Sequence, residues 1–250
     1  MVFDLGFFAL AIPAVMFAGI SKAGFGSGAA FAAAAVLALA VPPGLALGIM
    51  LPLLMMIDLA SLKPYWGKWD RPSSRSIIVG AVPGVALGAV VYAMVNADSF
   101  RILIGVICIA FVGYQWGRAR GLIRVGHFGF SHKWGWATGL AAGFTSFVSH
   151  AGGPPVAVFL LGQGIAKTTY QATTVVVFWA INLMKFVPYL FLGIFTAQTA
   201  LADLLLAPFA VGGAWLGVRA HHWVSDRVFF GLTYVLLLVT GIRLLWVALA

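Results

Sequence analysis

The chain has 250 residues, of which 62% are hydrophobic and only 8% are charged, and its formal net charge is +9. A soluble domain of this size carries roughly a quarter charged residues, so the composition excludes a soluble globular protein and predicts an integral membrane protein. The sequence pI is about 10.1. Its positive residues stand between apolar runs, which favours anchoring at an anionic membrane surface over binding to nucleic acid.

Apolar runs follow one another along the whole chain. Alternating strand-like runs are absent, and lipid offers backbone polar groups no partner outside the chain, so we expect an all-α fold of about ten transmembrane or half-membrane helices. The second and seventh runs are short, and each follows a glycine-rich break. Asp4 stands where a signal peptide would carry positive charge, so the first run is expected to remain as a span. The runs cover residues 3–20, 25–41, 44–62, 75–95, 99–117, 133–149, 152–165, 168–195, 199–218 and 227–248.

Positive charge is distributed unequally between the connections. Most Lys and Arg residues lie in odd-numbered connections, and the even-numbered ones carry only Arg101. The positive-inside rule therefore predicts that the odd connections are cytoplasmic and that both termini lie outside. The residues in odd connections are Lys63, Lys68, Arg71, Arg75, Arg118, Arg120, Arg124, Lys133, Lys167, Arg219 and Arg227.

The chain also carries a weak internal repeat. Ser-Lys-Ala-Gly at 21–24 aligns with Ser-His-Ala-Gly at 149–152, and Ile-Asp-Leu at 57–59 aligns with Ile-Asn-Leu at 181–183. We therefore expect a first repeat at 1–117, a basic cytoplasmic linker at 118–132 and a second repeat at 133–250. Five runs per half require the second repeat to be inverted, which is the plan of secondary transporters that bind substrate near the bilayer midplane.

Both repeats contain a break that suits an anion. Glycines let the backbone unwind, and Pro154 and Pro155 suit the first turn of a new half-helix, whose free N–H groups attract negative charge. Lys22 beside the first break and His150 beside the second would add positive charge. Tight helix crossings built on small residues remain the alternative explanation for the glycines.

Polar side chains inside apolar runs are the next candidates, because such residues are costly in lipid. Asp58 is the only acidic residue well inside a run, where it could carry a proton or reach toward Lys63. Asn182 and Lys185 are three residues apart on one face of the run 168–195. Together they offer an amide and a cation to an oxyanion.

The two break motifs, GISKAGFGSGAA and GFTSFVSHAGGPP, and the repeat of apolar helices resemble the TauE/SafE family of sulfite exporters. This resemblance implies a bacterial inner-membrane carrier for small sulfur-containing or carboxylated anions such as sulfite, sulfoacetate or thiosulfate. It implies substrate contacts at both breaks and at the polar residue that opens the following helix. The substrate residues expected from the motifs and the polar run together are Ser21, Lys22, Gly24, Gly26, Gly28, Ser149, His150, Gly152, Gly153, Pro154, Gln171, Asn182 and Lys185.

The function that follows is a secondary anion transporter, most simply an exporter, working by alternating access. Asp58 and His150 are the candidates for coupling to a proton, and sodium is the other coupling ion to consider. We expect no cofactor, no metal and no nucleic acid; the partners are a small anion, membrane lipid and, at most, a second copy in a homodimer. An anion channel is the alternative. An intramembrane enzyme fits poorly, because the chain has no Glu and no HExxH motif.

Overall fold

The computed structural model describes residues 3–25, 29–123, 129–220 and 226–250, and in these residues the regular structure is entirely helical. Gly26, Gly28 and Arg124, which the sequence analysis singled out, lie outside the described residues. The elements are α1 (Leu5–Ile20), the π-helix η1 (Ser21–Phe25), α2 (Phe31–Ala40), α3 (Pro43–Tyr65), α4 (Arg71–Met94), α5 (Ala97–Ala119), α6 (His132–Ser149), α7 (Gly153–Gly162), α8 (Lys167–Phe191), α9 (Ala197–Ala220) and α10 (Asp226–Leu249).

Each predicted run corresponds to one helix, and the chain is an all-α membrane protein. Seven of the described helices are long and apolar enough to cross a membrane. The prediction that the second and seventh runs are short is confirmed, since α2 and α7 have 10 residues each. At 1.5 Å per residue, such a helix covers about half of a hydrocarbon core of about 30 Å.

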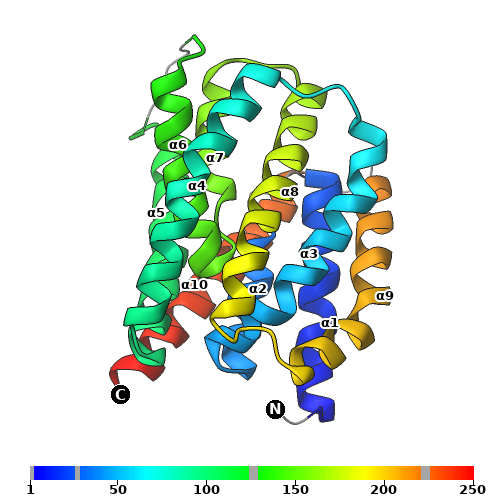
Figure 1. The fold of residues 1–250 in the computed structure, drawn as a ribbon, viewed down its shortest axis with the longest axis vertical. Helices are drawn as coiled ribbons and strands as arrows, with labels where there is room; N and C mark the ends of the chain where they lie inside the picture. Colours follow the sequence, from blue (N-terminus) through cyan, green and yellow to red (C-terminus); the bar gives the residue numbers. More distant parts are fainter. Residues whose placement is uncertain (1–2, 26–28, 124–128, 221–225) are drawn as a thin grey trace.

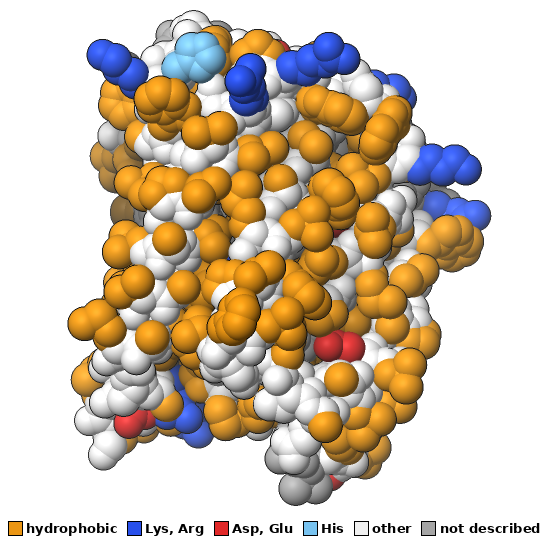
Figure 2. All heavy atoms as spheres, in the orientation of Figure 1, with side chains coloured by type: hydrophobic (Ala, Val, Ile, Leu, Met, Phe, Trp, Pro, Cys, Tyr) orange, Lys and Arg blue, Asp and Glu red, His pale blue; other side chains and the backbone are white. Residues whose placement is uncertain are grey.

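The helices form one bundle with two distinct ends (Figure 1). Both chain termini lie at one end, which we call the terminal end, whereas the α3–α4, α5–α6 and α7–α8 connections lie at the other. Figure 2 shows hydrophobic side chains over the lateral face and Lys and Arg side chains gathered at that second end, which we call the basic end. The structure thus places these odd-numbered connections together, as the charge pattern predicts.

Small residues allow two helix pairs to pack very closely. Gly139 of α6 lies against the backbone of α4, where an added Cβ would overlap the Ile77 carbonyl oxygen. On the other side of the bundle, Gly213 of α9 lies against Met16 of α1 in the same way. Among the described helices, α4 with α6 and α1 with α9 are therefore tight pairs, and α3 and α8 run between them.

This packing makes Gly139 a test of the fold. Gly139→Ala should lower the stability of the protein by about 1–3 kcal/mol, because a methyl group would be forced into backbone of α4. Thermal unfolding of the purified protein in detergent measures the effect. Gly113→Ala on α5 is the matched control, since nothing lies within 4 Å of a Cβ built there; equal melting temperatures of the two variants would contradict the packing argument.

Candidate functional site

The first break is a single turn of π-helix that continues α1. Residues Ser21–Phe25 leave the α-helical pattern, and such a turn leaves backbone carbonyls without their usual partners. The Gln171 side-chain amide of α8 donates a hydrogen bond of 2.8 Å to the Lys22 carbonyl oxygen. Because no water is present in the membrane core to do this, an interhelical amide stabilises the break.

The second break is a left-handed residue between α6 and α7. His150 has φ of 56°, a conformation that costs a non-glycine residue roughly 1–2 kcal/mol. The His150 amide donates to the Ser146 carbonyl at 2.9 Å, and the Ala151 amide donates to the Thr145 carbonyl at 3.1 Å. The predicted half-helix is confirmed, since α7 begins at Gly153 with a proline in its first turn. Strain that the fold holds in place is frequent at functional sites.

The two breaks meet in the middle of the bundle around a small polar cavity of about 10 Å³, which is room for about one water molecule. Lys22 comes from the π-helix, His150 from the left-handed turn, and Asn182 from α8. The complete lining is Lys22, Ala30, Leu54, Ser146, His150, Phe178 and Asn182. Residues that are far apart in the sequence therefore share one site, which we call the central site.

One half of the central site is a buried ion pair. The Lys22 ammonium lies 2.5 Å from the Asp58 carboxylate of α3, and both side chains are almost fully buried. The Asn182 amide donates to the second carboxylate oxygen at 2.7 Å. Asp58 therefore pairs with Lys22 across the break, and the alternative that it reaches toward Lys63 is wrong.

The other half is organised around Lys185 of α8, which is fully buried. Its ammonium donates to the Ser146 carbonyl at 3.1 Å and to the Ser146 hydroxyl at 3.0 Å, and it lies 2.9 Å from Nδ1 of His150. An ammonium has donors only, so Nδ1 accepts this bond and the imidazole proton is assigned to Nε2. Nε2 lies 3.4 Å from the Leu47 carbonyl oxygen of α3.

The charges of these groups do not balance. With both lysines protonated and Asp58 ionised, the central site carries one formal positive charge more than negative. Unpaired charge is expensive away from water, so the lysines are held by hydrogen bonds and by the single carboxylate. The arrangement can therefore accept one negative charge at low electrostatic cost.

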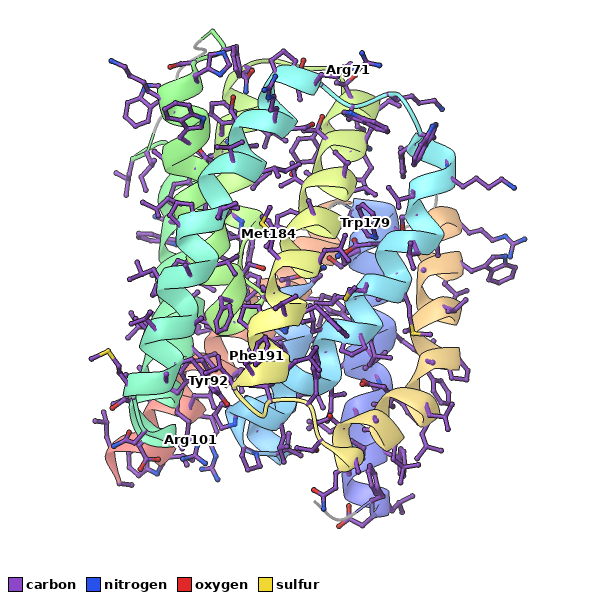
Figure 3. All side chains as sticks on the ribbon, viewed as in Figure 1. Arg71, Tyr92, Arg101, Trp179, Met184 and Phe191 are labelled. Atoms are coloured by element: carbon purple, nitrogen blue, oxygen red, sulfur yellow. The ribbon has the colours of Figure 1, made fainter. Side chains whose placement is uncertain are left out.

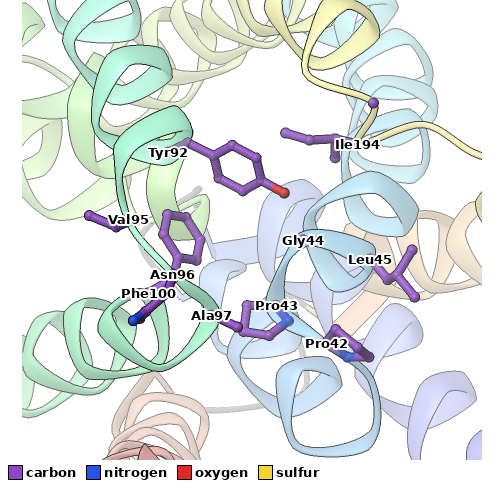
Figure 4. Close-up of a pocket in the computed structure, with 11 residues that line it drawn as sticks. Pro42, Pro43, Gly44, Leu45, Tyr92, Val95, Asn96, Ala97, Phe100 and Ile194 are labelled. Carbon is purple, nitrogen blue, oxygen red and sulfur yellow. The ribbon is translucent and has the colours of Figure 1, made fainter.

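A second cavity of about 320 Å³ opens at the terminal end of the bundle, and we call it the vestibule. Figure 4 shows the Tyr92 hydroxyl pointing across it, toward Gly44 at the start of α3. Its lining residues are Pro42, Pro43, Gly44, Leu45, Tyr92, Val95, Asn96, Ala97, Phe100, Gly193 and Ile194.

A series of aromatic rings runs from the vestibule to the central site. The Tyr92 ring lies 6.4 Å from Phe147, Phe147 lies 4.9 Å from Tyr189, and Tyr189 lies 6.4 Å from the His150 ring, measured between centroids. The Tyr189 hydroxyl donates to the Phe147 carbonyl at 2.7 Å. These three rings, Tyr92, Phe147 and Tyr189, form what we call the aromatic partition.

The sequence model of the sulfite exporter TauE/SafE family matches residues 11–244. This match covers both breaks and every residue of the central site. The chain belongs to the sulfite exporter TauE/SafE family. No curated protein and no solved structure was found to match it. Because TauE/SafE is a family of transporters, the chain is a multi-pass membrane transport protein and not an enzyme, as the sequence predicts.

Four predicted substrate residues of this TauE/SafE protein lie in or against the central site. Lys22, His150 and Asn182 line the cavity, and Lys185 contacts the His150 ring. Gln171 is buried too, but its amide is occupied by the Lys22 carbonyl. Gln171 therefore stabilises the backbone of the first break.

Other predicted residues serve the backbone around the site. Ser149 donates to the Thr145 carbonyl of its own helix, and Gly24 packs against the backbone of α9 at Gly217. Gly152 packs against α6 and the Phe178 ring. These two glycines fit the alternative of tight packing better than ligand contact. Ser21 is buried in the π-helix, and Gly153 and Pro154 form the first turn of α7.

Sequence reasoning missed two groups at the central site. Ser146 lies one helical turn before His150 and receives the Lys185 ammonium, and Phe178 lies one turn before Asn182 with its ring 5.9 Å from the Lys22 ammonium. The spacing of four residues was the available signal, because side chains four apart share a helix face.

The buried ion pair makes a prediction about stability. Asp58→Leu should destabilise the protein by about 3–5 kcal/mol, because it leaves Lys22 buried without a counter-charge. Adding Lys22→Met to Asp58→Leu should recover most of this loss. Thermal unfolding of the single and double variants in detergent measures the coupling.

The exposed pair of Asp98 with Arg101 provides a control. Asp98→Leu should change stability by about 1 kcal/mol or less. If the double variant at Lys22 and Asp58 is as unstable as the two single losses added together, the pairing argument fails.

Proposed function

We propose that the chain exports a small sulfur-containing oxyanion, such as sulfite or an organosulfonate like sulfoacetate, with thiosulfate as a further candidate, by secondary active transport. The excess positive charge at the central site carries this proposal. Lys22, Lys185 and His150 converge there from three elements, and Asp58 is the one acidic residue among the described groups that contact them. An oxyanion would neutralise the excess positive charge and accept hydrogen bonds from the two lysines and Asn182.

Substrate binding would replace the Asp58 carboxylate by the substrate anion as the partner of the Lys22 ammonium. The Asp58 carboxylate is bound to the Lys22 ammonium and the Asn182 amide, which are the donors that an oxyanion needs. Protonation of Asp58 would release both of them, so the proton on Asp58 and the anion on Lys22 would be coupled. His150 is the second candidate for proton coupling, since its ring already shares a hydrogen bond with Lys185.

The central site must open before it binds. Its cavity of about 10 Å³ holds about one water molecule, and an anion with three oxygen atoms needs several times this space. Movement of α3 against α8 would open it, because Asp58 and Asn182 join these two helices directly. Substrate binding and helix movement would then be the same event.

Packing supports an inverted-repeat mechanism of alternating access. If α1–α5 and α6–α10 are the two repeats, then α1 corresponds to α6 and α9 to α4, and the two tight pairs α1 with α9 and α6 with α4 are equivalent. The aligned residues Asp58 and Asn182 bond to each other, as residues next to a pseudo-twofold axis would. The offset of 128 residues that aligns 21–24 with 149–152 also aligns Gly84 with Gly212. Gly84 packs against the backbone of α6 at Leu140, whereas Gly212 has nothing within 4 Å and the neighbouring Gly213 makes the contact with α1.

We infer that the vestibule is the outer mouth of the transport path and that the aromatic partition closes it. The partition connects Tyr92 at the vestibule to His150 at the central site through ring contacts. With the basic end in the cytoplasm of a bacterial cell, according to the positive-inside rule, the terminal end and the vestibule face the outside.

Transport by purified variants tests the site. In proteoliposomes, Lys22→Met and Lys185→Met should each reduce sulfite transport about tenfold or more, because a hydrogen bond to a charged group contributes about 1.5–3 kcal/mol. His150→Gly removes the imidazole at a position where glycine adopts the backbone angle without strain, so its loss of transport would report on the ring itself. Lys63→Met, an exposed lysine of α3, should leave transport unchanged.

Counterflow separates a carrier from a channel. Unlabelled sulfite inside the vesicles should accelerate uptake of labelled sulfite by a carrier, whereas a pore gives no acceleration. Full transport by all three central-site variants would overturn the assignment of the substrate site. Transport without counterflow would overturn the carrier mechanism.

Cysteine labelling tests the partition and the orientation. Cys108 is the only cysteine in the chain, so Cys108→Ala provides a background for new ones. Leu45→Cys in the vestibule should react with a membrane-impermeant thiol reagent added outside intact cells, and Leu54→Cys at the central site should not. Adding Tyr92→Ala should increase the labelling rate at residue 54, because it removes the outer ring of the partition. Labelling of residue 45 only in inverted vesicles would contradict the orientation.

A further inference from the structure

A separate cavity of about 220 Å³ lies at the terminal end, where the last turns of α2 and α10 meet the first turn of α5. Two arginines line it, Arg101 of α5 and Arg243 of α10. The rest of its lining is mostly apolar: Ala38, Leu39, Ala40, Val41, Pro42, Leu244 and Val247. Figure 3 shows Arg101 at this end and Arg71 at the opposite, basic end.

A close helix crossing brings the two arginines to the same place. Gly105 of α5 and Gly241 of α10 face each other closely, since a Cβ built on either glycine would lie 3.0–3.1 Å from the carbonyl oxygen of the other. Arg101 lies one turn from Gly105, and Arg243 lies two residues from Gly241. Arg101 and Arg243, which are far apart in the sequence, therefore line one cavity at the terminal end. The loops at this end carry little positive charge.

The position of Arg243 needs an explanation. It lies within an apolar segment, Gly231–Leu249, that is long enough to span the membrane, and it is six residues, or about 9 Å, from the end of that helix. Among the described residues it makes no hydrogen bond or ion pair, whereas Arg101 pairs with Asp98. An arginine at this depth is costly unless it finds a partner, and its stem can extend along apolar surface toward the interface.

We propose that Arg101 and Arg243 bind the phosphate group of an anionic phospholipid. The two guanidinium groups would share the phosphate oxygens, for which their planar geometry is well suited. Leu39 and Val247 are exposed at the same cavity, so the acyl chains would continue over apolar surface in the leaflet at the terminal end. This site is separate from the central site and does not depend on the proposed transport function.

Native mass spectrometry of the detergent-purified protein tests the proposal. The wild-type protein should bind phosphatidylglycerol more tightly than phosphatidylcholine of the same acyl chains. Arg243→Gln and Arg101→Gln should each weaken phosphatidylglycerol binding by about tenfold, the loss expected for one charge-assisted contact. Arg71→Gln, which removes the same charge at the basic end, is the matched control and should bind as the wild type does. Arg243→Lys retains the charge without the planar fork, so an intermediate affinity is expected even if Arg243→Gln does not fold.

Free oxyanions distinguish a lipid from a soluble ligand. Inorganic phosphate and sulfite are titrated against the same variants in detergent without added lipid, with thermal unfolding as the measurement. Lipid binding that depends on both arginines, with no such dependence for the free anions, supports the proposal. Free-anion binding that needs Arg243 while phosphatidylglycerol binding does not would overturn the lipid assignment. Equal binding of phosphatidylglycerol by all variants would overturn the site.

Discussion

The structure depends on the need of every polar group in the membrane core to find a partner within the protein. The pair of Lys22 with Asp58 shows this constraint most directly, because both side chains are almost fully buried. Asn182 completes the coordination of the carboxylate, and Gln171 satisfies the carbonyl of the residue that carries the ammonium. Three helices are therefore fixed in register around a break that would otherwise be unstable in lipid.

The same constraint connects the chemistry of the site to movement of the helices. In a network of one carboxylate and two lysines, every polar group is satisfied only while each keeps its hydrogen-bond or ion-pair partner. Under the proposed function, an anion or a proton that entered the network would change which contacts are favourable, and the partners lie on different helices. In the proposed mechanism, binding energy would thus be converted into a rearrangement of the bundle, which is what a secondary transporter requires.

Packing determines which parts of the bundle can move as units. The glycine contacts hold α4 on α6 and α1 on α9 at backbone distance, and such close-packed pairs have little freedom to deform. Contacts between α3 and α8 include the polar bond of Asn182 with Asp58 at the central site. The aromatic partition adds large side chains between the vestibule and His150.

The sequence by itself determined the number and order of the helices, the two breaks and the end that carries positive charge. These properties depend on the free energy of transferring each segment, or each charge, from water to lipid. They can therefore be predicted from one segment at a time, without knowing which helices pack against it. Asn182 and Lys185 were found in this way, because a polar residue in an apolar run is conspicuous wherever it lies, and Lys22 and His150 were found beside the two breaks.

Only the tertiary structure decided which groups meet. It paired Asp58 with Lys22 rather than with Lys63, made Gln171 a support, and placed Ser146 rather than Ser149 against Lys185. It also brought Arg101 and Arg243 to one cavity. Partners are set by the distance and register between helices far apart in the chain, and periodicity within a single helix carries no information about either.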